Sequence, residues 1–409
     1  MTATRFALAR SAGSLAAGLS RRTGRGDGTT IGGRLTLLLD PTALAHAASD
    51  RDLALVSGTN GKTTTRTLLV AALSTLGPVV SNSGGANLPT GLTAALASDR
   101  VSHNGVLEVD EPFLPLVAAA VRPRAAVLLN LSRDQLDRYA EVARLAGIWR
   151  DALARPNSPS IIANCDDPLV VWAAMVAPEV IWVSAGQHWV ADTAVCPACG
   201  GIIVRRDSGG WSSDCGLSRP APDWTVDGDA AIDADGARHA VELAIPGEVN
   251  VGNAAMAAAT ATLWGVQPDA AFTAMSGIGE VEGRYLTATS RGVMARLLLA
   301  KNPAGWIEAL SMLPAGDCGL VIAVNARAAD GRDPSWLWDV PFEVLQGRFA
   351  VATGERSRDV AVRLRYAGVD HVRVDHEADA LRIAGRNGPV EVLANYTAFQ
   401  TYRRIVGDG

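Results

Sequence analysis

Lysine is almost absent from this sequence. The 409 residues include only Lys62 and Lys301, and arginine supplies the remaining positive side-chain charge. Lysine carries a compact ammonium, whereas arginine presents a planar fork of donors, so the two are not interchangeable. A lysine that is retained in an arginine-rich chain therefore indicates a position where a compact positive charge matters.

Other absences each exclude a class of protein. A net charge of −5, without a long basic stretch, argues against non-specific nucleic-acid binding. No apolar run is long enough to cross a bilayer, so we do not expect a membrane-spanning chain. Five unevenly spaced cysteines in a chain of this length fit a reducing compartment better than a disulfide framework, and we expect a cytoplasmic protein.

The composition that remains is that of a folded protein with two or three domains, being 48% hydrophobic and 19% charged. The alanine-rich start, residues 5–22, has some features of a signal peptide. Because Arg10 interrupts its apolar run and charges flank both sides, we expect a packed amphipathic helix instead.

The most informative stretch reads LALVSGTNGKTT, residues 53–64. Its apolar beginning predicts a buried strand, and residues 66–73 predict a helix, so a tight loop joins the two. Gly58 and Gly61 let the backbone turn sharply and bring its N–H groups close to an anion. The helix N-terminus adds partial positive charge, which favours phosphate binding.

Within this loop, Lys62 is placed to contact the β- and γ-phosphates of a nucleotide, and the Thr63 hydroxyl is placed to bind Mg²⁺. Thr59, Asn60 and Thr64 complete the loop. The strict phosphate-loop pattern has glycine where this chain has Val56, so the alternative is an ordinary strand-to-helix turn. The strand–loop–helix context favours a variant phosphate loop.

Further apolar runs alternate with helical segments and predict a mostly parallel sheet covered on both faces. These predicted strands are residues 79–82, 105–111, 125–130, 160–164 and 180–183. Ligands bind beyond the carboxyl ends of such strands, where the polar residues of this chain gather. Glu108, Asp110 and Glu111 stand at one such end and suit Mg²⁺ coordination; the alternative is that they are solvated loop acids. Asp134, after the strand at 125–130, could orient a magnesium-bound water or a reacting group; the alternative is a helix N-terminal acid stabilised by the dipole.

A small β-rich insertion is expected at about residues 190–222. Cys196, Cys199 and Cys215 resemble the two knuckles of a zinc ribbon, but Ser212 stands where the fourth cysteine is expected. Zinc binding by three thiolates is therefore left open. After the insertion, Asn253 begins a helical segment and is a candidate contact for a nucleotide base, whereas Asn250 could equally cap the helix.

A second α/β pattern starts near residue 293, with a helix expected near residues 335–347, and we place the boundary between domains 1–287 and 288–409. In this second domain, Lys301 at a strand end is a candidate phosphate or acyl-phosphate contact. The loop from 324 to 339 contains three aspartates and two tryptophans within ten residues, which indicates a functional loop; the alternative is a surface turn anchored by tryptophans.

Together these motifs resemble the Mur ligase superfamily, on the strength of residues 57–64, Glu108 and Asn253. The cysteine insertion, residues 130–138, 299–306 and 330–339 resemble more closely its MurT branch, the ATP-using subunits of lipid II isoglutaminyl synthases. The resemblance implies a central P-loop ATPase domain with a zinc-ribbon-like insertion and a Rossmann-like C-terminal domain. It also explains an absence. Chain-extending Mur ligases use a carbamylated lysine, and this chain has no lysine between Lys62 and Lys301.

The resemblance further implies the reaction: ATP phosphorylates the α-carboxyl of D-glutamate in the lipid II stem peptide, and ammonia then forms the amide. The ammonia would come from a GatD-like glutamine amidotransferase partner in a heterodimer, at the inner membrane face. An aspartate of the C-terminal domain would complete the partner's Cys–His pair, and Asp339 and Asp333 are the candidates. The expected nucleotide site also includes Arg284 and Asn325.

Two other functions are open from the sequence. One is a stand-alone amino-acid ligase of the folylpolyglutamate synthase type, and the other is a scaffold that binds ATP without transferring phosphate. The loop at residues 336–339 and the missing carbamylated lysine count against the first.

Overall fold

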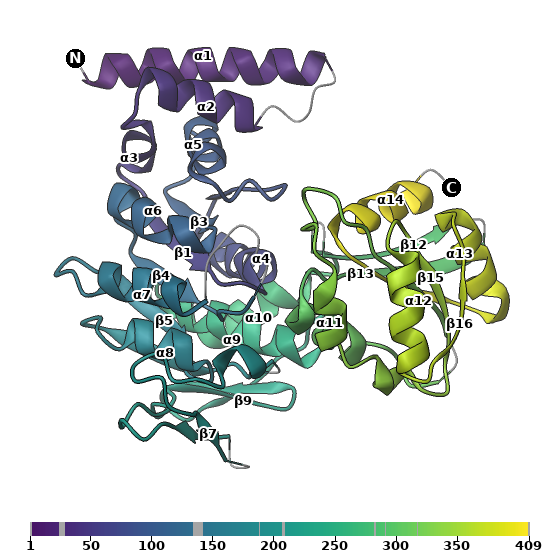
Figure 1. Ribbon diagram of the computed structural model, residues 1–409. Helices are drawn as coiled ribbons and strands as arrows, with labels where there is room; N and C mark the ends of the chain where they lie inside the picture. The colour runs from purple at the N-terminus through teal and green to yellow at the C-terminus, as the bar shows by residue number, and fades with distance from the viewer. Residues whose placement is uncertain are drawn as a thin grey trace.

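The computed structural model describes residues 2–23, 29–133, 142–187, 189–206, 209–281, 284–290, 292–316 and 318–407. Two α/β units lie side by side, each built on its own sheet, with the N-terminal helices stacked at one end of the first unit (Figure 1).

The first unit contains a nine-stranded sheet in the order β11-β10-β9-β6-β5-β4-β1-β3-β2. Strands β1 to β6 are parallel, and β9 is parallel to β6, because helices carry the chain back across the sheet. The strands are β1 (Asp52–Ser57), β2 (Val79–Ser81), β3 (Asn104–Glu108), β4 (Ala125–Leu128), β5 (Ser160–Asn164), β6 (Val180–Ser184), β9 (Trp224–Asp227), β10 (Ala230–Ile232) and β11 (Arg238–Ala240). The mostly parallel sheet expected from the sequence is confirmed.

Helices cover both faces of this sheet. One face packs against α4 (Lys62–Leu73), α9 (Glu248–Thr262) and α10 (Pro268–Ser276). The other packs against α3 (Ala43–Ala48), α5 (Pro89–Ser98), α6 (Leu114–Val121), α7 (Val142–Leu153) and α8 (Pro168–Ala174). Neighbouring β1 residues such as Ala54 and Leu55 therefore enter different cores, which is why this strand is apolar throughout.

The short 3-10 turns of this unit are η1 (Ser74–Leu76), η2 (Glu111–Phe113) and η3 (Ala191–Thr193). The β-rich insertion contains a separate two-stranded ribbon, β7 (Val204–Arg205) and β8 (Trp211–Ser212). Its core includes Cys196, Trp211 and Leu217 and rests against Cys165 and Val171 of the large domain. Strands β9 to β11 belong to the large sheet and not to the insertion.

The chain begins with two stacked helices, α1 (Thr2–Arg22) and α2 (Thr29–Leu39), and α2 in turn packs on α5 (Figure 1). Glycines make this stacking close. A Cβ at Gly32 would lie 2.9 Å from the Gly13 carbonyl oxygen, and a Cβ at Gly33 would lie 1.8 Å from the Thr90 carbonyl oxygen. The helix expected at the N-terminus is confirmed.

The second unit is a six-stranded sheet in the order β12-β13-β17-β14-β15-β16, in which only β12 is antiparallel to its neighbour. The strands are β12 (Tyr285–Ser290), β13 (Val293–Leu299), β14 (Gly319–Ala323), β15 (Phe349–Thr353), β16 (Asp370–Arg373) and β17 (Val390–Ala394). One face packs against α11 (Pro303–Ser311), α12 (Ser357–Tyr366), η4 (Ser335–Asp339) and η5 (Phe342–Leu345). The other packs against α13 (Glu377–Ala384) and α14 (Tyr396–Gly407), and η6 (Gly385–Asn387) follows α13.

Two expectations for this unit need correction. The boundary expected at residue 287 falls inside β12, which already belongs to the second sheet, so the division lies before Tyr285. The helix expected near 335–347 is two 3-10 turns, η4 and η5. Pro341 separates them because proline has no N–H to continue a helix.

Among the residues described, no helix is both long enough and apolar enough to cross a membrane.

The glycine contact between α2 and α5 gives a stability prediction. We expect Gly33→Ala to destabilise the fold by about 1–3 kcal/mol, because the new methyl group would overlap the Thr90 backbone. Gly18→Ala in α1 is the matched control, because no atom lies within 4 Å of the position that a Cβ would take there and alanine favours a helix. Urea denaturation measures both; equal stability of the two variants would contradict the close packing.

Candidate functional site

The loop after β1 has the geometry of a phosphate-binding loop. β1 ends at Ser57 and α4 begins at Lys62, so the predicted helix is present but starts four residues earlier than residue 66. Gly58 and Gly61 have φ values of 147° and 83°. A Cβ would lie 2.8 Å from the Leu129 Cβ at the first and 2.7 Å from Asn253 Oδ1 at the second. Backbone conformation and space therefore both require glycine at these two positions.

Lys62 is buried at the start of α4. Its Nζ donates to the Gly58 carbonyl oxygen at 2.5 Å and to Glu111 Oε1 at 2.6 Å. Burial alone would lower the pKa of Lys62, but Glu111, followed by Glu108 and Asp110, raises this pKa above its ordinary value. The ammonium is therefore kept charged where a nucleotide phosphate would approach.

Glu111 is the partner of Lys62, a role that the sequence analysis did not assign. Burial raises the pKa of Glu111 to about 7, with Lys62 opposing the rise and Asp110 adding to it. A bound polyphosphate would compete with this carboxylate for the same ammonium. The only sequence signal was an acid just beyond the predicted strand end, because the contact depends on the η2 turn that follows β3.

Glu108 lies beside the loop because it is the last residue of β3 and pairs in register with Val56 of β1. Asn82 fixes its backbone: Glu108 N donates to Asn82 Oδ1 at 2.9 Å, and Asn82 Nδ2 donates to the Glu108 carbonyl oxygen at 3.0 Å. The Glu108 carboxylate is buried, and its Oε2 lies 3.8 Å from Arg66 Nε. This places a carboxylate near the first turn of α4, where Thr63 stands.

The segment after β4 is joined to the phosphate loop by hydrogen bonds. Asn60 N donates to Asn130 Oδ1 at 2.9 Å, and Thr59 N donates to the Asn130 carbonyl oxygen at 2.9 Å. Thr59 Oγ1 donates to the Ser132 carbonyl oxygen at 3.1 Å and accepts from Ser132 N at 2.9 Å. Thr59 and Asn60 thus position the loop. Asp134 in the same segment lies outside the described residues.

The second domain contacts the loop directly. Asn60 and Asn302 exchange side-chain amide hydrogen bonds of 3.3 and 3.2 Å. Asn302 Oδ1 also accepts from Gly305 N at 2.9 Å and so caps α11. This one amide therefore fixes both the start of α11 and the approach of the second domain to the loop.

A pocket between the two domains collects half of the residues expected to bind nucleotide. Among its lining residues are Asn60, Gly61, Thr64, Asn250, Asn253, Arg284, Lys301 and Glu308. Asn253 Oδ1 accepts from Thr65 Oγ1 at 3.2 Å, and its Nδ2 donates to Asn250 Oδ1 at 3.2 Å.

Glu308 of α11 is a further residue of this pocket that sequence reasoning missed. Burial raises its pKa to about 7, and Arg284 opposes this rise. A carboxyl group that faces Arg284 in the pocket suits the recognition of hydroxyl groups or bases. No local motif marks Glu308, because α11 brings it there from the second domain.

Asn325, which was expected in the nucleotide site, is not among the residues that line this pocket. It is buried at the carboxyl end of the second sheet, where its Oδ1 accepts from Glu355 N at 2.9 Å and its Nδ2 donates to Thr397 Oγ1 at 3.0 Å. Its amide group therefore joins the segments that follow β14, β15 and β17.

The two aspartates of the tryptophan loop differ in their contacts. Asp339 Oδ2 lies 3.3 Å from Arg133 Nη2, and Arg133 Nε in turn pairs with Asp192 Oδ1 at 2.6 Å. Asp333 Oδ1 accepts from Ser335 N at 2.9 Å and so begins the η4 turn. The structure thus links Asp339, and not Asp333, to the first domain by an ion pair in the part of the chain it describes.

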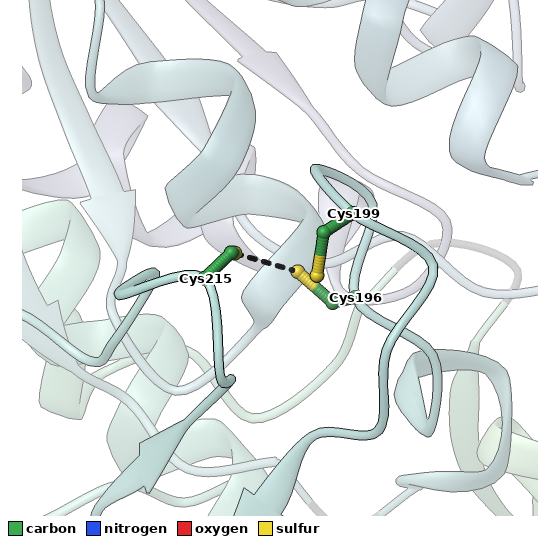
Figure 2. Close-up of side chains that lie close together, drawn as sticks. All are labelled: Cys196, Cys199 and Cys215. Carbon is green, nitrogen blue, oxygen red and sulfur yellow. Dashed lines mark hydrogen bonds between the residues drawn. The ribbon is translucent and has the colours of Figure 1, made fainter.

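The three cysteines of the insertion converge (Figure 2). Cys196 Sγ lies 3.7 Å from Cys215 Sγ, and all three sulfur atoms lie within 4.8 Å of one another. Hydrogen bonds, first from Ser213 and then from Gly201 N, lower the pKa of Cys199 to about 7. A low thiol pKa and soft sulfur donors suit zinc.

Ser213, and not Ser212, occupies the fourth position of this cluster. Ser213 Oγ lies 3.5 Å from Cys199 Sγ and is buried, whereas Ser212 lies in β8. The two knuckles also differ in length, because Gly200 N donates to the Cys196 carbonyl oxygen and Gly216 N donates to the Ser213 carbonyl oxygen. The second turn is one residue shorter, so counting by the spacing of the first gave the wrong serine.

Two protein-family models match this chain. The model of the Mur ligase middle domain matches residues 56–200, and the model of the MurT ligase C-terminal domain matches residues 299–399. The chain therefore contains a Mur ligase middle domain and a MurT-type C-terminal domain. The resemblance inferred from the sequence is thereby confirmed.

The chain is 28% identical, over 93% of its own length and 93% of the relative's, to the lipid II isoglutaminyl synthase (glutamine-hydrolyzing) subunit MurT of Streptococcus pneumoniae. Its fold is similar to that of a pseudomurein peptide ligase type C from Methanothermus fervidus, with a TM-score of 0.68 and 19% identity over 88% of this chain and 79% of that one. It is also similar to the MurF ligase of Thermotoga maritima in complex with ADP, with a TM-score of 0.63 and 15% identity over 90% of this chain and 83% of that one.

Proposed function

We propose that the chain is the ATP-using subunit of a lipid II isoglutaminyl synthase, which amidates the D-glutamate α-carboxyl of the lipid II stem peptide. The observation that carries the proposal is the phosphate loop, in which the buried Lys62 pairs with Glu111 and Glu108 stands beside the loop, while Asn60, Gly61 and Thr64 line the interdomain pocket. The similarity of the chain to a named MurT subunit covers 93% of both proteins. The ADP complex of the similar MurF ligase supports ATP as the nucleotide.

The chemistry needs activation, because a carboxylate is a poor electrophile. An oxygen of the substrate carboxylate attacks the γ-phosphorus of ATP, and ADP leaves with the electrons of the broken P–O bond. Ammonia then attacks the acyl phosphate, phosphate leaves and a proton is lost, which gives the carboxamide. Lys62 balances the charge of the transferring phosphoryl group, and the backbone N–H groups of Gly61, Lys62 and Thr63 at the start of α4 cradle the phosphates.

Glu108 and Thr63 are the residues that would hold Mg²⁺ together with phosphate oxygens, since this ion takes oxygen ligands. The burial of Glu108 beside the loop fits that donor set. When bound, the ion supplies positive charge to the polyphosphate. Asn253 and Arg284, with Glu308 in the same pocket, would position the base and ribose, and Lys301, which also lines this pocket, would contact the acyl phosphate.

Ammonia would come from a separate GatD-like glutaminase subunit. Among the described residues, none of the five cysteines has the neighbouring general base that a glutamine-hydrolysing nucleophile needs. Burial also raises the pKa of Cys165 to about 12. A partner must therefore contribute that cysteine. The partner and lipid II would meet this chain at the cytoplasmic face of the membrane.

The central experiment compares nitrogen sources. We expect the purified chain with ATP and lipid II to form amidated product from ammonium salt alone, and from glutamine only when the glutaminase partner is added. Lys62→Met should lower both activities by about 100-fold, because the phosphoryl charge loses its compact partner. Lys62→Arg should also be impaired, since a planar guanidinium does not replace an ammonium in this loop.

The variant Glu108→Gln tests the proposed Mg²⁺ ligand. Glu242→Gln, at an exposed position elsewhere in the chain, is its matched control. Activity retained by Glu108→Gln would favour a nucleotide-binding scaffold. Ligation of an added amino acid in place of ammonia would favour a stand-alone ligase of the folylpolyglutamate synthase type. Either outcome would remove the amidation proposal.

Asp339 or Asp333 is proposed to complete the partner's glutaminase site. We expect Asp339→Asn or Asp333→Asn to lower glutamine-driven amidation at least tenfold while ammonia-driven amidation stays unchanged, because only the ammonia supply is affected. Parallel assays with the two nitrogen sources measure the split. If each variant loses both activities to the same extent, neither aspartate acts through the partner.

The cysteine cluster is proposed to bind zinc through Cys196, Cys199 and Cys215, with the Ser213 hydroxyl or a water at the fourth position. Structural zinc sites usually have four protein ligands, so this site is expected to release zinc readily. Ser213→Cys should complete the tetrahedron and slow zinc loss to a chelator at least tenfold. Ser212→Cys is the matched control and should have no such effect; metal release followed with a colorimetric chelator decides, and equal rates for both variants would refute the assignment.

A further inference from the structure

The first helix carries an apolar ridge that nothing in the described structure covers. Leu8, Leu15 and Leu19 are 68%, 76% and 65% exposed. At 100° per residue these three positions fall within an arc of about 40° on the helix. Single exposed leucines are ordinary on protein surfaces, but three aligned along one helix form a continuous apolar strip.

This ridge lies on the outside of the molecule. Figure 1 shows α1 running along the top of the first domain, with α2 between it and α5. The opposite side of α1 is used in packing, because Ala9 and Gly13 are buried and Gly13 contacts Gly32 and Thr36 of α2. On α2, Ile31 and Leu38 are also exposed and add apolar surface to the same end of the molecule.

The same segment concentrates positive charge. Residues 1–39 include six arginines and a single acid, Asp27, although the whole chain has a net charge of −5. Arg5 and Arg22 are exposed near the two ends of the leucine ridge. An apolar strip with arginines at its ends is the pattern of a helix that lies in the interface of an anionic bilayer.

A groove lies on the packed side of α1. It has a volume of about 510 Å³, and its lining residues include Arg10, Ser14 and Arg21 of α1 and residues 81–83 at the end of the edge strand β2. At 100° per residue, these α1 positions are centred about 140° away from the leucine ridge. The groove is therefore separate from the apolar ridge.

We propose that α1 docks the chain on an anionic phospholipid bilayer through Leu8, Leu15 and Leu19, with the flanking arginines against the lipid headgroups. The docking proposal rests on the proposed function in one respect: a lipid-linked substrate gives the docking a purpose. A second copy of the chain fits this surface less well, because two facing helices would bring their arginines together.

Vesicle co-sedimentation tests the docking. We expect the full chain to bind vesicles of phosphatidylglycerol and phosphatidylcholine in a 1:1 ratio, to bind vesicles of phosphatidylcholine alone at least tenfold more weakly, and to dissociate as salt is raised. The triple variant Leu8→Ser, Leu15→Ser, Leu19→Ser should lose at least tenfold in binding to the mixed vesicles. The double variant Arg5→Gln, Arg22→Gln should lose the preference for phosphatidylglycerol.

The matched control replaces three exposed apolar residues elsewhere, in Leu76→Ser, Val101→Ser and Leu116→Ser, and should bind as the unchanged chain does. Thermal melting checks that the triple variants fold. Equal vesicle binding by the ridge variant and the control would overturn the proposal. So would a dimer, measured by light scattering, that the ridge variant converts to monomer.

Two further readouts separate this proposal from the proposed function. Ammonia-driven amidation of lipid II in detergent micelles should be the same for the ridge variant and the unchanged chain, whereas amidation of lipid II in mixed vesicles should fall at least tenfold for the ridge variant. If no amidation occurs in either form, the proposed function fails while vesicle binding can still stand. If amidation occurs but vesicle binding is absent, only the docking proposal fails.

Discussion

The ammonium of Lys62 is the group on which the site depends. It is buried just beyond the carboxyl end of β1, held by the Gly58 carbonyl oxygen on one side and Glu111 on the other. A buried charge is tolerated only when it is paired and hydrogen-bonded. The two glycines, the η2 turn that presents Glu111 and the β3 end that presents Glu108 therefore form one arrangement around a single positive charge.

The interface between the two domains extends that arrangement. Asn60 belongs to the phosphate loop and Asn302 caps α11, so their amide pair couples the loop to a helix of the second domain. The pocket forms between the two domains. Asn253 and Arg284, which precede the second sheet in the sequence, line it together with Lys301 and Glu308 of the second domain. A nucleotide there would contact both domains at once, which is how a two-domain ligase can couple phosphate binding to the placement of a second substrate.

Function in this chain is distributed over surfaces with different chemistry. The phosphate loop and the interdomain pocket form the proposed nucleotide site, the tryptophan loop with Asp339 lies next to Arg133 of the first domain, and the N-terminal helices carry arginine and leucine outward. The cysteine insertion packs on the large domain through Trp211, which donates to the Cys165 carbonyl oxygen, and its Asp192 pairs with the same Arg133. This arrangement would let the proposed partner protein, bilayer and ATP be engaged at once.

The sequence by itself determined the features that depend on neighbours along the chain. The apolar run, the two glycines and Lys62 predicted the strand–loop–helix of the phosphate loop, because backbone conformation and strand burial are local properties. Tertiary structure alone decided which distant groups meet: Asn60 pairs with a residue 242 positions away, Glu308 reaches the pocket from α11, and Asn325 joins strand ends instead. It also decided that Ser213 joins the cysteines, because the length of a turn cannot be read from residue spacing when one knuckle is a residue shorter. Contacts across such separations depend on how sheets and helices pack, and no local pattern of residues encodes that packing.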